Sequence, residues 1–246
     1  MSVLQSSCLI PALLTVVTVG CSKSADRPPE QQGSNAPVSV QGSAAPSAVT
    51  CASHACIAAA GEALVAHFDD PAVQRHAFET FQSACNAGVM EGCSQLGGLY
   101  ADGIGIAADL AKARQLYEQA CSGSDGLGCS NLGALYAKGE DVTRDDAKAV
   151  SLYQRACDGG FLLACTNLGF MYSRGTGVAI DPAKALALYG HSCEGNEPKA
   201  CANLGSTYLR GTSGVKADRA KAVEYYRKAC GLGDQPSCDW VAKQQQ

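Results

Sequence analysis

The chain repeats itself every 36 residues over most of its C-terminal part. The repeat is marked by cysteines whose successive steps are 36, 36, 36 and 37 residues, namely Cys93, Cys129, Cys165, Cys201 and Cys238. A fixed period of this length means that one small structural unit is used several times and that neighbouring units bury a shared core. The chain is therefore expected to fold as a stack of similar units.

Each unit opens with the pattern Cys-x-x-Leu-Gly-x-x-Tyr, for example at Cys129, Leu132, Gly133 and Tyr136. Spacings of three and seven residues place Cys, Leu and Tyr on one face of a helix. The pattern then runs to a recurring glycine, the residue that best tolerates left-handed backbone after a helix end. These glycines are Gly103, Gly139, Gly175 and Gly211. The pattern predicts the first helix of each unit.

A second amphipathic helix is predicted after a short loop. An aspartate, a favoured helix N-cap, precedes each of these Ala-rich stretches. The four aspartates are Asp109, Asp145, Asp181 and Asp218. Pro182 follows Asp181 directly and occupies the first helical position, where proline is accommodated without loss of a hydrogen bond. Each unit is thus expected to be a helical hairpin, and the fold all-α.

The repeats are expected to be closed by a cap at each end. Residues 92–236 hold four repeats, residues 51–91 form a degenerate N-terminal cap repeat, and residues 237–246 form a C-terminal cap. In the N-terminal cap, Pro71–Cys85 matches a second helix, and Cys56–Phe68 matches a first helix that has lost the Leu-Gly-x-x-Tyr pattern. Terminal repeats of stacked proteins are commonly atypical in this way.

The second helix carries the pattern Lys-Ala-x-x-x-Tyr-x-x-Ala, beginning at Lys112, Lys148, Lys184 and Lys221. With the first-helix pattern, this unit resembles the Sel-one-like repeat, a relative of the tetratricopeptide repeat. The resemblance covers Cys85 to Cys238 and implies a right-handed α-α solenoid. Two cysteines per unit make it similar to the secreted, cysteine-rich branch of that family, of the helicobacter cysteine-rich protein type.

The 14 cysteines point either to an oxidising compartment or to metal sites. Ten of them form five pairs with one spacing: Cys85 with Cys93, Cys121 with Cys129, Cys157 with Cys165, Cys193 with Cys201, and Cys230 with Cys238. In each pair the first cysteine ends a second helix and the other opens the next unit, so a disulfide would join neighbouring repeats. The chain-entropy model gives such a bridge about 2.5 kcal/mol of stabilisation.

Cys51 and Cys56 are expected to form a sixth, irregular bridge. A metal site is the alternative, because Cys51, His54 and Cys56 are close together in the sequence. We disfavour it because structural zinc sites prefer Cys-x-x-Cys steps, which this chain lacks, and because secretion oxidises thiols. We therefore expect neither a metal nor another cofactor.

The N-terminus resembles an export signal. An apolar stretch of 12 residues, Leu9 to Gly20, is too short to span a bilayer but fits the hydrophobic part of a signal peptide. It ends in Thr18-Val19-Gly20-Cys21, which resembles a bacterial lipoprotein cleavage box and makes Cys21 the lipidation candidate. Thr18 departs from the usual Leu, and no Lys or Arg precedes Cys21. Residues 1–21 are interpreted as the signal peptide.

Residues 22–50 are rich in Pro, Ser, Gly and Ala and poor in bulky apolar groups, so burial cannot offset their ordering entropy. They are expected to be a disordered tether. A lipid at Cys21 would hold the repeats at a membrane surface without a spanning helix. The protein is accordingly expected to be an extracytoplasmic, periplasmic or outer-membrane lipoprotein, or alternatively a secreted protein with Cys21 unmodified.

The sequence gives catalysis no visible site. Some cysteine-rich relatives carry a penicillin-binding or β-lactamase label, so a hydrolase acting on β-lactam or peptidoglycan-like amides is the alternative function. The serine route needs Ser-x-x-Lys with Ser-Asp-Asn and Lys-Thr-Gly, and only the first occurs, at Ser213–Lys216. Nucleic-acid binding is disfavoured because the formal net charge is −4 and no global basic balance exists.

A binding surface is better supported. Two residues after the repeat cysteine lies an amide row, Gln95, Asn131, Asn167 and Asn203. Seven residues later lies a mostly basic row, Asp102, Lys138, Arg174 and Arg210, on the same helix face. Resemblance to tetratricopeptide stacks places first helices on the concave side, where these rows would contact a peptide, protein or cell-wall partner. The alternatives are that the amides bond neighbouring helices and that the basic row is merely solvated.

Overall fold

The computed structural model describes residues 53–212 and 214–244. The expected signal peptide, the lipidation of Cys21, the tether and the pairing of Cys51 with Cys56 therefore lie wholly or partly outside the described residues. None of the helices in the described part is long and apolar enough to cross a bilayer.

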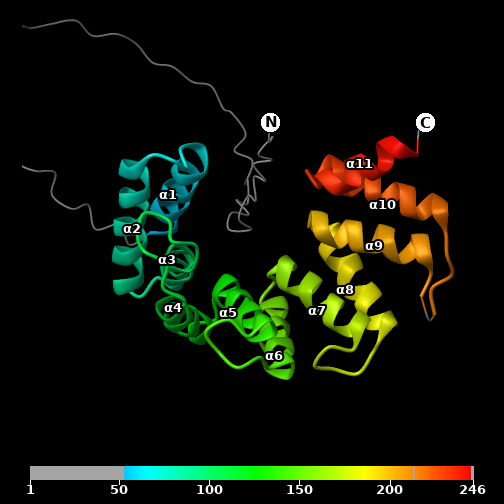
Figure 1. Ribbon diagram of the computed structural model, residues 1–246, viewed down its shortest axis with the longest axis horizontal. Helices are drawn as coiled ribbons and strands as arrows, with labels where there is room; N and C mark the ends of the chain where they lie inside the picture. Colours follow the sequence, from blue (N-terminus) through cyan, green and yellow to red (C-terminus); the bar gives the residue numbers. More distant parts are fainter. Residues whose placement is uncertain (1–52, 213, 245–246) are drawn as a thin grey trace, which may run out of the picture.

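The described residues form helices and no strand apart from an isolated bridge between Thr212 and Val215. The helices are α1 (His54–Ala66), α2 (Pro71–Asn86), α3 (Met90–Asp102), α4 (Leu110–Ser122), α5 (Gly126–Lys138), α6 (Asp146–Asp158), α7 (Leu162–Arg174), α8 (Pro182–Glu194), α9 (Pro198–Arg210), α10 (Arg219–Gly231) and α11 (Gln235–Lys243). They follow a curved path that brings α1 and α11 to the two ends of an open ring (Figure 1). The predicted all-α solenoid is confirmed.

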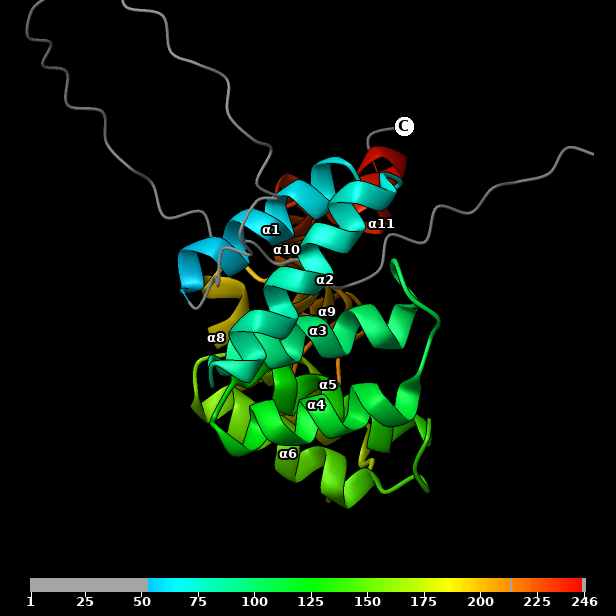
Figure 2. The ribbon, with the colours of Figure 1, turned by 90° about the vertical axis from the view of Figure 1, so that its left-hand side faces the viewer.

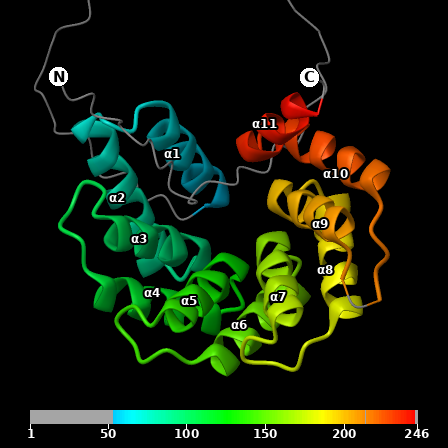
Figure 3. The same cartoon turned by 45° about the vertical axis from the view of Figure 1, so that its right-hand side comes forward.

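Each hairpin packs its two helices together and then packs on the next hairpin. Viewed from the N-terminal side, helices α1 to α6 lie one below another as layers of a stack (Figure 2). The first helices α3, α5, α7 and α9 also contact one another in succession. They lie on the inner side of the ring, whereas α4, α6, α8 and α10 lie on its outer side (Figure 3). The concave surface is therefore built from first helices.

The helix ends form at the residues that the sequence pattern indicates. In each second helix the aspartate carboxylate accepts a hydrogen bond from the backbone N–H three residues on, at 2.9–3.0 Å, as an N-cap does. The first helices α3, α5 and α7 end at Gly103, Gly139 and Gly175 in left-handed backbone. Gly211 instead has φ 69° and ψ 157°, in the loop that holds the extra residue.

The glycine of the first-helix pattern makes room for the tyrosine of the second helix. A Cβ atom placed on Gly169 would lie 2.8 Å from the ring of Tyr189, and the equivalent distance from Gly97 to Tyr117 is 2.6 Å. Tyr117, Tyr153 and Tyr189 are all buried. The tyrosine ring and the glycine backbone thus form the contact that sets how closely the two helices of a hairpin approach.

The tyrosine of the first-helix pattern lies at the edge of the core and not within it. Tyr136 and Tyr172 are only half-buried, and the ammonium groups of Lys148 and Lys184 lie 4.0 and 4.3 Å from their ring centroids. Each ammonium also donates a hydrogen bond to the tyrosine hydroxyl, at 2.6 Å. The Lys of the second-helix pattern therefore covers the Tyr of the first by a cation–π contact.

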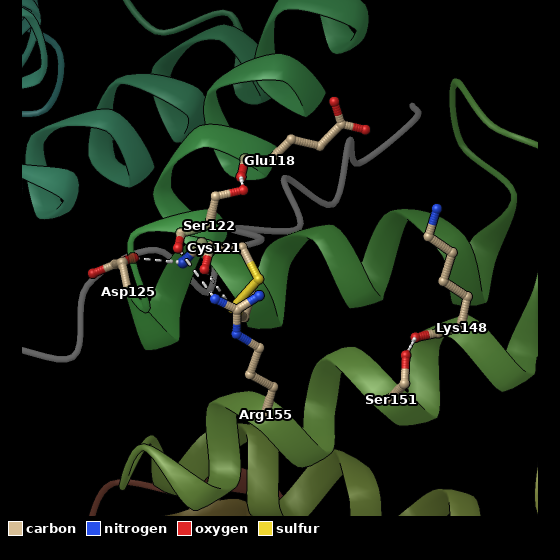
Figure 4. Close-up of a disulfide and its surroundings, with 9 residues drawn as sticks. Glu118, Cys121, Ser122, Asp125, Lys148, Ser151 and Arg155 are labelled. Atoms are coloured by element: carbon tan, nitrogen blue, oxygen red, sulfur yellow. Dashed lines mark hydrogen bonds between the residues drawn. A yellow bond between two sulfur atoms is a disulfide. The ribbon is translucent and has the colours of Figure 1, made fainter.

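Disulfides join successive hairpins, as the sequence predicts. The five bridges are Cys85–Cys93, Cys121–Cys129, Cys157–Cys165, Cys193–Cys201 and Cys230–Cys238, with Cα–Cα distances of 4.4–4.8 Å. Each connects the end of a second helix to the start of the next first helix. Close to Cys121, Arg155 of α6 donates to the Ser122 carbonyl at 3.3 Å, a second link between neighbouring units (Figure 4).

Replacing Gly169 with Ala is expected to destabilise the protein, because the new methyl group overlaps the buried ring of Tyr189. We expect the free energy of unfolding to fall by about 1–2 kcal/mol. Gly190, in the interior of α8, has no atom within 4 Å of an added Cβ and serves as the matched control. Gly190→Ala should raise stability by about 0.5–1 kcal/mol because Ala favours helix. Urea unfolding followed by circular dichroism measures both; equal effects would contradict the packing role.

The last disulfide is expected to be reduced first under native conditions. Cys230 and Cys238 are both half-buried, whereas every other described bridge includes a cysteine that is at most 1% exposed. Limited treatment with a small thiol, followed by alkylation and peptide mass spectrometry, should label Cys230 and Cys238 before the rest. In guanidinium chloride this order should disappear. Early labelling of Cys121 and Cys129 in the native protein would show that burial does not protect the bridges.

Candidate functional site

The two rows predicted from the sequence lie on the first helices that line the concave surface. Gln95, Asn131, Asn167 and Asn203 belong to α3, α5, α7 and α9, and all four are half-buried. Asp102, Lys138, Arg174 and Arg210 end the same four helices and are exposed. One helical face therefore presents a half-buried amide and, two turns later, an exposed charge.

Part of these rows surrounds a hollow of about 520 Å³. The hollow brings Asn131 and Lys138 of α5 together with Asn167 of α7 and Asp102 of α3. Lys199 of α9 also lines it, so four successive first helices contribute. Gln95, Asn203, Arg174 and Arg210 do not line this hollow.

The lining of the hollow includes both acidic and basic side chains. Partial burial raises the pKa of the Asp102 carboxyl group, and the positive charge of Lys138 counteracts this rise. Lys138 also forms an ion pair with Glu140, at 3.5 Å between Nζ and Oε2. Lys138 therefore has carboxylates of the same protein close to its ammonium group.

Asn131 has a partner within the protein. Burial and the Asp102 carboxylate raise the pKa of Tyr117, whereas the interaction of its hydroxyl with the Asn131 side chain lowers it. In the next repeat, burial alone raises the pKa of Tyr153 to about 12. Asn131 and Asn167 both line the hollow, but only Asn131 enters the causes of a tyrosine pKa shift, which supports the scaffold interpretation for Asn131.

Phe170 is a concave residue that the row patterns do not predict. It lies three residues after Asn167, on the same face of α7, and 47% of it is exposed. Its ring lies 5.5 Å from the guanidinium carbon of Arg174. The same repeat position holds Gly98, Ala134 and Ser206 in the other units. The signal for Phe170 is therefore a single departure from an otherwise small position.

The residues of the two alternative chemistries lie only partly within the described part of the chain. Ser213 lies outside the described residues, and Lys216 is exposed in the loop before α10. Among residues 53–212 and 214–244, no group of three or more His, Cys, Asp or Glu side chains is placed to hold a metal ion. Within this part, His54 contacts Glu91, with 2.5 Å between Nδ1 and Oε2.

The comparison with protein families decides which repeat this is. Sel1 repeats match residues 91–125, 126–161, 162–196 and 198–234, together more than half of the chain. The chain belongs to the Sel1 repeat family. In each Sel1 repeat the matched segment contains one hairpin of the solenoid, from α3 and α4 to α9 and α10.

Solved structures with TM-scores above 0.5 share this fold. A Sel1 repeat protein from Oxalobacter formigenes is 23% identical, with a TM-score of 0.63 over 70% of this chain and 75% of that one. The antigen c5321 of uropathogenic Escherichia coli is 26% identical, with a TM-score of 0.57 over 72% of this chain and 42% of its own length. Cysteine-rich protein B of Helicobacter pylori is 26% identical, with a TM-score of 0.45 over 56% of this chain and 99% of its own. None of the curated proteins compared with the chain matches it.

Replacing Asn131 with Ala is expected to cost stability, whereas replacing Asn167 is not. Asn131→Ala removes the side chain that interacts with the buried Tyr117 hydroxyl, which should lower the free energy of unfolding by about 1 kcal/mol. Asn167→Ala should stay within about 0.5 kcal/mol of the parent protein. Urea unfolding of the parent protein and the two variants measures the change in the free energy of unfolding. Equal losses would mean that the whole amide row is scaffolding.

Proposed function

We propose that this protein is an extracytoplasmic repeat scaffold whose concave face binds a peptide, protein or cell-wall component. The hollow that spans α3, α5, α7 and α9 carries the proposal, because it combines amide, acidic and basic side chains on one accessible surface. Stacked repeat proteins use such extended concave surfaces for binding. Catalysis is not part of the proposal.

The five disulfides support a place outside the cytoplasm. Disulfides persist in oxidising compartments and are rare where thiols are kept reduced. Every repeat interface described here carries one, and the cysteines at the start of α3, α5, α7 and α9 are at most 1% exposed. We further propose that Cys21 carries a lipid, which would hold the solenoid at a periplasmic or outer-membrane surface.

A photo-cross-linking amino acid tests the concave face. Ala134 lines the hollow, so a benzoylphenylalanine at this position is expected to form an adduct of discrete mass with the bound partner in intact, exporting cells. Glu224 on α10 is exposed on the outer side and provides the matched control, which should give no such adduct. The readout is a mass shift on denaturing gels. Adducts from Glu224 alone, or from neither position, would contradict concave binding.

A further inference from the structure

We propose that the part of the concave face formed by α7 and α9 selects an acidic protein segment that carries an apolar side chain next to its carboxylates. Phe170, Arg174 and Arg210 form this selecting site. The inference rests on the proposed function. It adds the chemistry of the partner and the residues that would recognise that partner.

Phe170 provides the apolar contact. A phenylalanine with 47% of its surface exposed is a large apolar residue to leave in water. The other repeats place Gly98, Ala134 and Ser206 at this position, so packing of the hairpin does not require a ring here. Aromatic side chains with polar surroundings commonly anchor protein partners. Phe170 is therefore the apolar anchor of the concave face.

Arg174 is oriented by this ring. Its guanidinium carbon lies 5.5 Å from the ring centroid of Phe170. A guanidinium that lies against an aromatic ring keeps donors at its edge for a bidentate contact with a carboxylate. One ligand residue pair, apolar and acidic, would thus contact Phe170 and Arg174 together.

The three basic residues of the row are not equivalent. Lys138 is compensated by Glu140 and by the nearby Asp102. In the part of the chain that the structure describes, neither Arg174 nor Arg210 has a carboxylate within ion-pair distance. Arg210 donates instead to the neutral Ser206 hydroxyl. The uncompensated positive charge of the row therefore lies on α7 and α9.

Charge complementarity thus points to an anionic partner, and the neighbouring amides favour a polypeptide. Asn167 and Asn203 lie on α7 and α9, on the same helix face as the two arginines. An amide side chain both donates and accepts, as a peptide backbone requires. Because α7 and α9 contact each other, an extended segment laid across both helices would meet both arginines.

Fluorescence anisotropy with three labelled peptides tests the proposal on the intact, oxidised protein. The first peptide alternates Glu and Leu, the second replaces every Glu with Lys, and the third replaces every Leu with Ser. We expect the Glu–Leu peptide to bind at least about tenfold more tightly than either of the others. Raising the salt concentration should weaken the binding of the Glu–Leu peptide, because salt screens exposed charges.

Variants assign the binding to the site. The affinity for the Glu–Leu peptide should fall about tenfold in each of the variants Phe170→Ala, Arg174→Gln and Arg210→Gln. Lys138→Gln should change its affinity less than about twofold, because this charge is already compensated. Phe68→Ala, an exposed aromatic near α1, and Arg227→Gln, an exposed cation on α10, are the controls for loss of a ring and of a charge. Circular dichroism must show the parent fold in every variant.

Three results would overturn the inference. The first is that the Lys–Leu or Glu–Ser peptide binds as tightly as the Glu–Leu peptide, and the second is that the Glu–Leu peptide does not bind. The third is that Arg174→Gln and Arg227→Gln lower its affinity equally. If peptidoglycan fragments bind while the acidic peptide does not, the partner class is wrong. A cross-link from position 134 in any of these cases would leave the proposed concave function standing. If neither the peptide binding nor the cross-link is observed, both the inferred acidic partner and the proposed concave function are wrong.

Discussion

The disulfide between consecutive hairpins is the interaction on which the rest of the structure depends. In a solenoid each unit contacts only its neighbours, so stability is a sum of hairpins and the interfaces between them. The hairpins of this protein have a lean interior, because the position after each pattern lysine is a buried alanine, at Ala113, Ala149, Ala185 and Ala222. Small side chains bury little apolar surface. A covalent link at each interface offsets this by limiting the unfolded chain.

The contacts that pack the helices together use different residues from those exposed on the concave surface. The glycine–tyrosine contact, the aspartate cap and the lysine–tyrosine stack recur from hairpin to hairpin and determine how the helices meet. One concave position takes no part in these contacts and differs between units, as Ala134 and Phe170 show. A repeat can thus change an exposed concave side chain without changing its fold. Asn131 is the exception, because its side chain also interacts with Tyr117.

The sequence predicts the fold well because each of its determinants is local. Cys129, Leu132 and the cap at Asp145 act within one hairpin or across one turn, so helical spacing alone reveals them. The disulfides follow because eight residues separate each pair across a single turn. The two concave rows are also visible, since they repeat with the same period.

The repeat period does not reveal features of the concave surface that depend on distances between helices or on a single residue that departs from the repeat. The compensation of Lys138 by Asp102 joins α5 to α3, and the place of Lys199 in the hollow joins α9 to α5. Phe170 breaks the pattern, so averaging over repeats hides it.

Covalent links between hairpins also bear on binding. The segment proposed to cross α7 and α9 would meet side chains from two repeats at once, so its affinity would depend on how firmly these repeats are held relative to each other. The bridge Cys193–Cys201 links α8 of one of these repeats to α9 of the other, and Cys157–Cys165 links α7 to the preceding repeat. Holding the helices in place before binding lowers the ordering cost that a partner must otherwise offset. The same sulfur atoms that stabilise a lean core would therefore also preorganise the concave surface that we propose as the binding face.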